Sequence, residues 1–215
     1  LYTGDNTAGQ AQTGVGFQPD FTWIKNRGAT ASNTLFDAIR GVEKPVYSDD
    51  SAAEGTNANT LTAWGADGFT VGNDTGTGSS STFVAWNWKA NGAGSLNEVG
   101  SIDSTVSADT TSGFSIVKYQ GTGANATVGH GLGTVPKMII FKNLTQTVSW
   151  IVYSSELNIS SSNCLRLNGT NAAFTESAWN GTRPTTSVFS LGTHNEANNS
   201  SGETIAYCFA EISGY

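Results

Sequence analysis

The sequence predicts an all-β protein made of two tandem duplicated antiparallel β-sandwich domains of jelly-roll-like architecture. A stretch near the N-terminus recurs without a gap in the second half of the chain, which is the mark of an internal repeat. Short apolar segments alternate with turns rich in Gly, Asn, Ser and Thr, the pattern of an antiparallel sandwich. Aromatic residues also follow a period of two near the end of each copy, as they do on one face of a strand.

The repeat is clearest in residues 2–26 and 119–143, which read YTGDNTAGQAQTGVGFQPDFTWIKN and YQGTGANATVGHGLGTVPKMIIFKN. The two copies share a tyrosine, several glycines, a proline and a Lys-Asn pair, residues that suit turns and strand ends. The repeat predicts a first domain at 1–90, a linker at 91–100 and a second domain at 101–215. Only Leu1-Tyr2 remain of the strand GFSIVKY found in the second copy, so we expect the sequence to begin inside a domain, without its first strand.

Each copy is expected to contain about six or seven short strands. The clearest candidates are 21–26, 34–41, 44–50, 67–72 and 82–90 in the first copy, and 113–119, 138–143, 149–157, 163–169, 187–192 and 203–211 in the second. Segment 34–41 also has helical spacing, but its counterpart is rich in β-branched and aromatic residues, which favours a strand. A short helix is an alternative only in the polar segments that end at Trp64 and Trp179.

Apolar residues predict which strands are buried. Both faces of 138–143 are apolar, so we expect this strand to be central and covered on both sides. In the terminal segments, Trp86 and Trp88 share one face, as do Tyr207 and Phe209. We expect these aromatics to form a buried face in each domain.

Composition argues against several classes of protein. The net charge is −7 and the isoelectric point is near 4.6, which disfavours binding to nucleic acids or to anionic membrane surfaces. No apolar run approaches the roughly 20 residues of a membrane-spanning helix. Two cysteines, Cys164 and Cys208, are too few for a disulfide framework, and the sequence favours free thiols over a bridge.

We predict no catalytic residue, no bound metal and no cofactor. His130 and His194 both lie in Gly- and Asn-rich turns, Thr13 takes the place of His130 in the first copy, and the chain has no G-x-S-x-G motif. The acidic residues are scattered, and nothing brings two of them together beside a cleft for glycoside hydrolysis. Asp67 and Asp74 offer oxygen ligands for Ca²⁺, but they lack the order of an EF-hand and suit tight turns equally well.

Two tryptophans are candidates for ligand binding. Trp64 and Trp179 occupy equivalent places before the strands that begin with DGF and SVF. An indole beside Asn180 and Arg183 suits stacking on a sugar ring, since shallow sites bind through amphipathic aromatics and a few polar groups. We therefore name these four residues as candidate ligand-binding residues. The alternative is that both tryptophans are core anchors, kept because both copies need them.

Four stretches resemble a repeated domain of virion proteins from tailed bacteriophages: residues 16–41, 67–90, 113–143 and 203–215. That domain is common in marine and cyanobacterial phages, often at the C-terminal end of tail-fibre-like or other host-facing proteins. The resemblance covers nearly the whole chain, 1–90 and 101–215. It implies a β-sandwich, assembly into the virion, homotrimers and attachment to a surface, and it carries no catalytic residues.

The resemblance thus implies a non-enzymatic structural protein of the virion, assembled in the host cytoplasm and exposed to the medium as a tail-fibre or spike component. Its expected partners are other virion proteins, further copies of itself in a trimer, and a glycan or protein of the host surface. One alternative is a capsid decoration protein that stabilises the shell. Another is a glycan-binding module or a fragment of a polysaccharide depolymerase. The acidic surface, low in charge, suits a particle that must stay soluble outside a cell.

Overall fold

A computed structural model describes residues 1–158 and 162–213. The protein is all-β, with several antiparallel sheets and, in the described part, a single short helix, α1 (Asn195–Asn198). Nothing helical in these residues has the length and apolarity needed to cross a membrane. The chain divides into two compact units: unit 1 comprises Leu1–Asp50 and Glu54–Ala93, and unit 2 comprises Ser51–Ala53 and Gly94–Tyr215.

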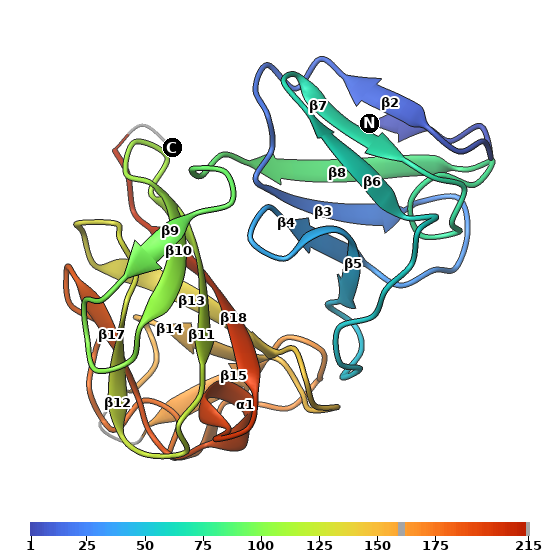
Figure 1. Cartoon of the computed structure of the whole chain (residues 1–215). Coiled ribbons are helices and arrows are strands. Elements are labelled where there is room, and N and C mark those ends of the chain that lie inside the picture. The colour runs from blue at the N-terminus through green and yellow to red at the C-terminus, as the bar shows by residue number, and fades with distance from the viewer. Residues whose placement is uncertain (159–161, 214–215) are drawn as a thin grey trace. The chain divides into compact units, whose positions relative to one another are not determined.

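Unit 1 contains two antiparallel sheets (Figure 1). Its strands are β1 (Tyr2–Thr3), β2 (Gln10–Thr13), β3 (Phe21–Asn26), β4 (Thr34–Asp37), β5 (Gly41–Tyr47), β6 (Leu61–Gly65), β7 (Gly68–Val71) and β8 (Thr82–Trp88). One sheet has the order β1-β8-β3-β4-β5 and the other the order β2-β7-β6. A buried cluster joins Ile24 and Phe83 of the first sheet to Leu61, Phe69 and Val71 of the second, so the core of this unit lies between its sheets.

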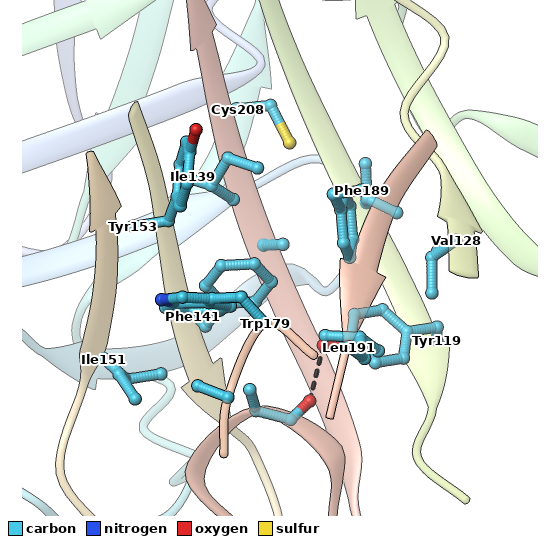
Figure 2. Packing of buried hydrophobic residues seen from close by; sticks show 14 of the residues in the cluster. Tyr119, Val128, Ile139, Phe141, Ile151, Tyr153, Trp179, Phe189, Leu191 and Cys208 are labelled. Carbon is cyan, nitrogen blue, oxygen red and sulfur yellow. Dashed lines mark hydrogen bonds between the residues drawn. The ribbon is translucent and has the colours of Figure 1, made fainter. Parts of the chain in front are cut away.

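Unit 2 is built on a larger sheet. Its strands are β9 (Ser95–Asn97), β10 (Ser104–Asp109), β11 (Phe114–Gln120), β12 (Ala126–Gly129), β13 (Pro136–Asn143), β14 (Ile151–Ser154), β15 (Asn163–Arg166), β16 (Phe174–Thr175), β17 (Val188–Leu191) and β18 (Glu203–Ala210). The large sheet has the order β16-β15-β14-β13-β18-β11-β10-β9, and β12 pairs with β17. Figure 2 shows the core cluster on one face of the large sheet, with Phe141 and Trp179 next to each other and Phe189 of β17 nearby.

The strand order of unit 1 recurs in unit 2. The order β1-β8-β3-β4-β5 corresponds to β11-β18-β13-β14-β15, and the pair β2-β7 corresponds to β12-β17. A tyrosine anchor recurs with it: the Tyr2 hydroxyl donates to the Thr77 carbonyl at 2.5 Å, and the Tyr119 hydroxyl donates to the Ala197 carbonyl at 2.6 Å. The large sheet continues past β11 into β10 and β9, whereas the described part of unit 1 has no strand beyond β1.

Several predicted elements are confirmed. In the segment 34–41 the predicted strand is confirmed for Thr34–Asp37, which form β4, whereas residues 38–40 form a turn. Strand β13 is central, because it pairs with β14 on one side and with β18 on the other. Its residues Ile139 and Phe141 enter the core cluster, and Ile140 is buried on the opposite face.

Two predictions about loops need correction. The predicted linker 91–100 contains strand β9, which pairs with β10 along Ser95–Asn97. Its composition looked like that of a linker because pairing at a sheet edge uses the backbone and needs no apolar side chain. The helix α1 lies in the loop 193–202, not in the segments that end at Trp64 and Trp179, and the His194 side chain caps it by accepting from the Glu196 N–H.

The predicted aromatic face is confirmed only in part: Phe209 and Trp88 are half-buried, and the two remaining residues differ. Tyr207 of β18 is fully buried, whereas Trp86 of β8 is 48% exposed. Phe83 and Ala85 point into the core between the sheets, so strand alternation turns Trp86 to the opposite face, where its ring meets Trp23 edge-on at 6.5 Å. A period of two shows which side chains share a face, but it does not show whether that face is covered.

Candidate functional site

The hydrogen bonds of the two units correct the pairing of Trp64 with Trp179. Gly72 and its counterpart Gly192 each donate their N–H to a backbone carbonyl, at 2.6 and 2.7 Å. The next residue along the chain after the one that provides this carbonyl is Leu61 in unit 1 and Trp179 in unit 2. Trp64 lies further along β6. The sequence comparison missed this because the polar segments before the two tryptophans differ in length.

Trp179 is a core residue. Its side chain is 2% exposed, and its ring lies 5.1 Å from Phe141 and 5.9 Å from Tyr153 (Figure 2). Its indole N–H donates to the Asn163 carbonyl at 3.1 Å. Its ring is therefore packed within the protein and its polar atom has a partner there. This position is the one that the core-anchor alternative predicts, and ligand stacking by this indole has no structural support here.

The other three candidate residues do not assemble into a site around an exposed indole. Trp64 is half-buried and packs against the core cluster of unit 1. In unit 2, Asn180 is an exposed turn residue with a φ of 50° that accepts a hydrogen bond from Asn125 at 2.9 Å. Arg183 is exposed and donates to the Ser155 carbonyl at 2.7 Å. These interactions hold loops in place, which is a structural role.

His130 is buried rather than exposed in a turn. Its Nδ1 accepts from the Leu132 N–H at 3.3 Å, and its Nε2 lies 3.1 Å from the Thr185 carbonyl. This pair of partners requires a neutral ring with the proton on Nε2. Burial lowers the pKa of His130 below its ordinary value, because the charged form loses its hydration. The position thus belongs to the core of unit 2.

A charged cluster around His194 was not predicted. The Glu196 carboxylate, 7% exposed at the residue level, accepts from Arg166 at 3.1 Å, and His194 Nε2 lies 3.6 Å from the Glu176 carboxylate. Arg166 belongs to β15 and Glu196 to α1, so the ion pair ties this short helix to the sheet. Sequence reasoning had no signal for the cluster, since its members come from separate elements.

The acidic residues considered for Ca²⁺ are engaged in turns. The Asp67 carboxylate accepts from the N–H groups of Gly14 at 3.0 Å and Gly16 at 2.6 Å, and these bonds lower the pKa of Asp67. Asp74 accepts from the Asn57 amide at 3.0 Å. Within residues 1–158 and 162–213, no group of three His, Cys, Asp or Glu side chains is arranged to hold a metal ion.

The two cysteines are free and buried. Both lie in the core cluster of unit 2, where they contribute apolar volume. Burial raises the pKa of the Cys164 and Cys208 thiols to about 12, so both stay protonated at neutral pH.

Unit 1 contains a groove of about 640 Å³, here called the β8 groove. Residues of β1, β2, β7 and β8 and of the segment 14–17 line it, among them Tyr2, Phe17, Phe69 and Trp86. Gln12 also lines it, and its side-chain Nε2 is buried with no hydrogen-bond partner within the described parts of the chain. Aromatic walls with a buried donor that has no partner are features of a binding surface.

Trp86 joins this groove to an exposed aromatic surface. Its indole is 48% exposed and contacts Trp23 of the neighbouring strand β3, directly opposite in the ladder. Amphipathic rings held by a sheet suit stacking against a flat apolar face, such as that of a sugar. This part of unit 1 therefore offers a ligand aromatic contact and backbone hydrogen bonds.

Comparison with known proteins adds the family. Residues 1–215 match a domain of unknown function, DUF7483. The chain belongs to this family. No curated protein and no solved structure matches the chain. The DUF7483 match spans both units, so the β8 groove and the charged cluster at His194 both lie within the family domain.

Proposed function

We propose that this DUF7483 protein is a non-enzymatic structural component of a tailed-bacteriophage particle. In this proposal the two units are tandem copies of one jelly-roll-like β-sandwich, displayed on a tail fibre or spike for attachment to the host. One observation carries it: the four stretches that resemble phage virion domains contribute strands to the sheets whose order recurs in both units. The residues that resemble the phage domain are therefore also residues of the strands whose order recurs in the two units.

The surface chemistry supports display outside a cell. The chain has a net charge of −7, and only 13% of its residues are charged. Loops such as residues 72–81 are rich in Gly, Ser, Thr and Asn and are organised by the Asp74 carboxylate, which accepts from the Gly76 N–H at 2.7 Å. Ordered loops with few charges on an acidic domain resist nonspecific binding to anionic material.

Attachment would use the exposed Trp86 of unit 1 together with Trp23, which is half-buried beside it. Trp86 and Trp23 offer a surface on which a host glycan can stack, and this exposure also favours a second candidate function, a glycan-binding module outside a virion. The two functions differ in where the protein resides. A homotrimer belongs to the first proposal, because self-association is one way of covering exposed sheet edges.

Locating the protein on purified particles tests the proposal. Gold-labelled antibody should mark tail fibres or spikes, and particle proteomics should recover the chain. Labelling of the shell, with loss of capsid stability but normal adsorption on deletion, would favour a decoration protein. Absence from particles together with release of reducing sugar from host polysaccharide would refute the structural proposal.

The attachment site is tested by Trp86→Ala on the particle or on the isolated chain. Host adsorption or glycan-array signal should fall about 10-fold, because stacking on one aromatic contributes roughly 1 kcal/mol or more. Trp64→Ala is the matched control, since it removes a tryptophan of the same unit that packs against the core. Equal effects of the two substitutions would show that the loss comes from unfolding.

A further inference from the structure

A small pocket lies in unit 1 on the β4–β5 side of its larger sheet, and it shares no lining residue with the β8 groove. Its volume is about 280 Å³, and residues of segment 30–34, Tyr47 of β5 and segment 74–76 line it. We call it the β5 pocket. Its wall includes parts of loops 27–33 and 72–81, whose sequences differ from those of their counterparts in unit 2. The β5 pocket is therefore a place where the two units have different side chains.

Strand pairing shows which residues of unit 2 correspond to this wall. Thr34 corresponds to Ile151, because each pairs with the equivalent residue of the neighbouring strand, β3 in unit 1 and β13 in unit 2. Their partners on the other side are Tyr47 and Arg166, which therefore correspond as well. At these two places unit 1 has a hydroxyl and a phenol where unit 2 has an apolar side chain and a guanidinium.

The loop that faces these strands differs in the same way. Counting from the matched glycine that precedes the loop in each unit, Gly76 corresponds to Glu196. The Glu196 carboxylate accepts from Arg166 at 3.1 Å and so joins α1 to β15. Unit 1 has Gly76 and Tyr47 at the positions of these two charged residues. The β5 pocket thus lies where an ion pair bridges loop and strand in unit 2.

A buried hydroxyl without a partner lies in the wall of the pocket. Thr34 is 1% exposed, and its Oγ1 has no hydrogen-bond partner within residues 1–158 and 162–213. This oxygen faces the loop, since a Cβ added to Gly76 would lie 2.9 Å from it. The fold does not need a hydroxyl at this position, because unit 2 has Ile151 there. Buried polar groups nearly always have a partner, so this hydroxyl marks a place for a ligand atom.

The rest of the wall favours a ligand that donates hydrogen bonds. Among the lining residues only Asp74 is charged. Its carboxylate accepts from the Gly76 N–H at 2.7 Å and from the Asn57 amide at 3.0 Å, which leaves part of its capacity for about four hydrogen bonds unused. Burial and then the charges of Asp74 and Asp50 raise the pKa of Tyr47, so the potential here is negative. An anionic ligand is therefore disfavoured.

A hydroxylated ring suits this wall better than a metal ion does. One hydroxyl group can donate to Asp74 while another accepts from Thr34, and the Tyr47 ring offers contact with the apolar face of a sugar. Ca²⁺ takes about six to eight oxygen ligands, whereas the one carboxylate here already accepts from two N–H donors. Pockets for drug-sized molecules measure roughly 300 to 1,000 Å³, so the β5 pocket has room for a single ring.

We propose that the β5 pocket binds one polyhydroxylated ring, such as a hexopyranose at the end of a glycan, through Thr34, Asp74 and Tyr47. A hydroxyl of the ring donates to the Asp74 carboxylate, and an oxygen of the ring accepts from the Thr34 hydroxyl. The ligand then bridges β5 and segment 74–76, as the ion pair bridges β15 and α1 in unit 2. This site is separate from Trp86, and it does not depend on a role in a phage particle.

Titration of the full chain with simple sugars, followed by amide chemical shifts, tests the site. The probes are the methyl pyranosides of glucose, galactose, mannose and N-acetylglucosamine. At least one should cause saturable shifts at residues 30–34, 47 and 74–76, with a Kd of roughly 1 mM. Thr34→Val removes the hydroxyl but keeps the shape of the side chain, and it should raise this Kd about 10-fold. The variant should fold, because unit 2 has the apolar Ile151 at this position.

Thr77→Val is the matched control. Thr77 is also fully buried, and its hydroxyl likewise has no partner in the described part of the chain, but it does not line the pocket. Its Kd should equal that of the unchanged protein. No shifts with any of the four sugars at about 100 mM, far above the expected Kd, would overturn the proposal and leave a pocket that holds water only. Shifts of the same amides with CaCl₂ alone would overturn it in favour of a metal ion, and equal weakening by both substitutions would remove the role assigned to Thr34.

Discussion

Replacing Trp179 with alanine is expected to destabilise unit 2 by about 3 to 5 kcal/mol. The side chain is 2% exposed and packs against Phe141 and Tyr153. A buried tryptophan hides roughly 150 to 250 Å², and at about 25 cal/mol per Å² this is about 4 to 6 kcal/mol as an upper estimate. The substitution also leaves the Asn163 carbonyl without its indole donor, which adds roughly 1 kcal/mol.

Local measurement is essential, because the chain has two units and a single unfolding curve can mix two transitions. Hydrogen exchange read by mass spectrometry separates them: peptides from β13 and β18 report unit 2, and peptides from β3 and β8 report unit 1. Trp179→Ala should lower the opening free energy of the first set and leave the second set unchanged. Trp179→Phe keeps an aromatic ring and should have a smaller effect.

Trp64→Ala is the matched control in unit 1. The Trp64 side chain is half-buried, and its indole nitrogen has no hydrogen-bond partner within the described residues, so less is lost on truncation. Its effect should be smaller than that of Trp179→Ala and confined to unit 1. The burial argument fails if Trp179→Ala changes the stability of unit 2 by less than about 1 kcal/mol. Loss of glycan binding with unchanged stability would instead return Trp179 to the ligand-binding candidates.

Three further substitutions and measurements probe unit 2. Burial lowers the pKa of His130, so the unfolded chain takes up a proton at this residue before the folded chain does as the pH falls. The contribution of neutral His130 to the free energy of unfolding is therefore fully present above about pH 6.5 and declines below it. His130→Gln should flatten this decline, measured by urea titrations at several pH values. Tyr119→Phe should cost about 0.5 to 1.5 kcal/mol by chemical denaturation, because a buried carbonyl loses its donor. Cys164 and Cys208, with pKa values raised to about 12, should react with a thiol reagent at pH 8 only after unfolding; fast labelling of the native protein would contradict their burial.

Glycines account for much of what the sequence predicts correctly. A Cβ on Gly72 would lie 2.3 Å from the Asn59 carbonyl oxygen, and one on Gly192 would lie 1.9 Å from the carbonyl oxygen of Ser177. No side chain fits at either place, so glycine is retained wherever this backbone approach recurs. Identity at such positions reports shared backbone geometry, and for this reason strand positions could be read from the repeat.

The candidate site could not be read in the same way. Trp64 and Trp179 look equivalent because both precede a strand, yet the backbone hydrogen bonds place Leu61 in the position of Trp179. Apolar alternation predicts burial of Trp86 as strongly as burial of Tyr207, although only Tyr207 is buried. Both errors have one cause: local sequence reports the spacing of side chains, whereas burial depends on which distant strands cover them.

The two units, as described, differ at the edge beyond β1 and β11. Cores and tyrosine anchors recur, so substitutions there act on stability in both units. Unit 2 protects its β18 edge with β11, β10 and β9, whereas in unit 1 β1 covers only two residues of β8. An unprotected edge is a liability in a soluble protein unless something pairs with it. Pairing with β11 from Glu203 to Phe209 protects that edge of β18 in unit 2.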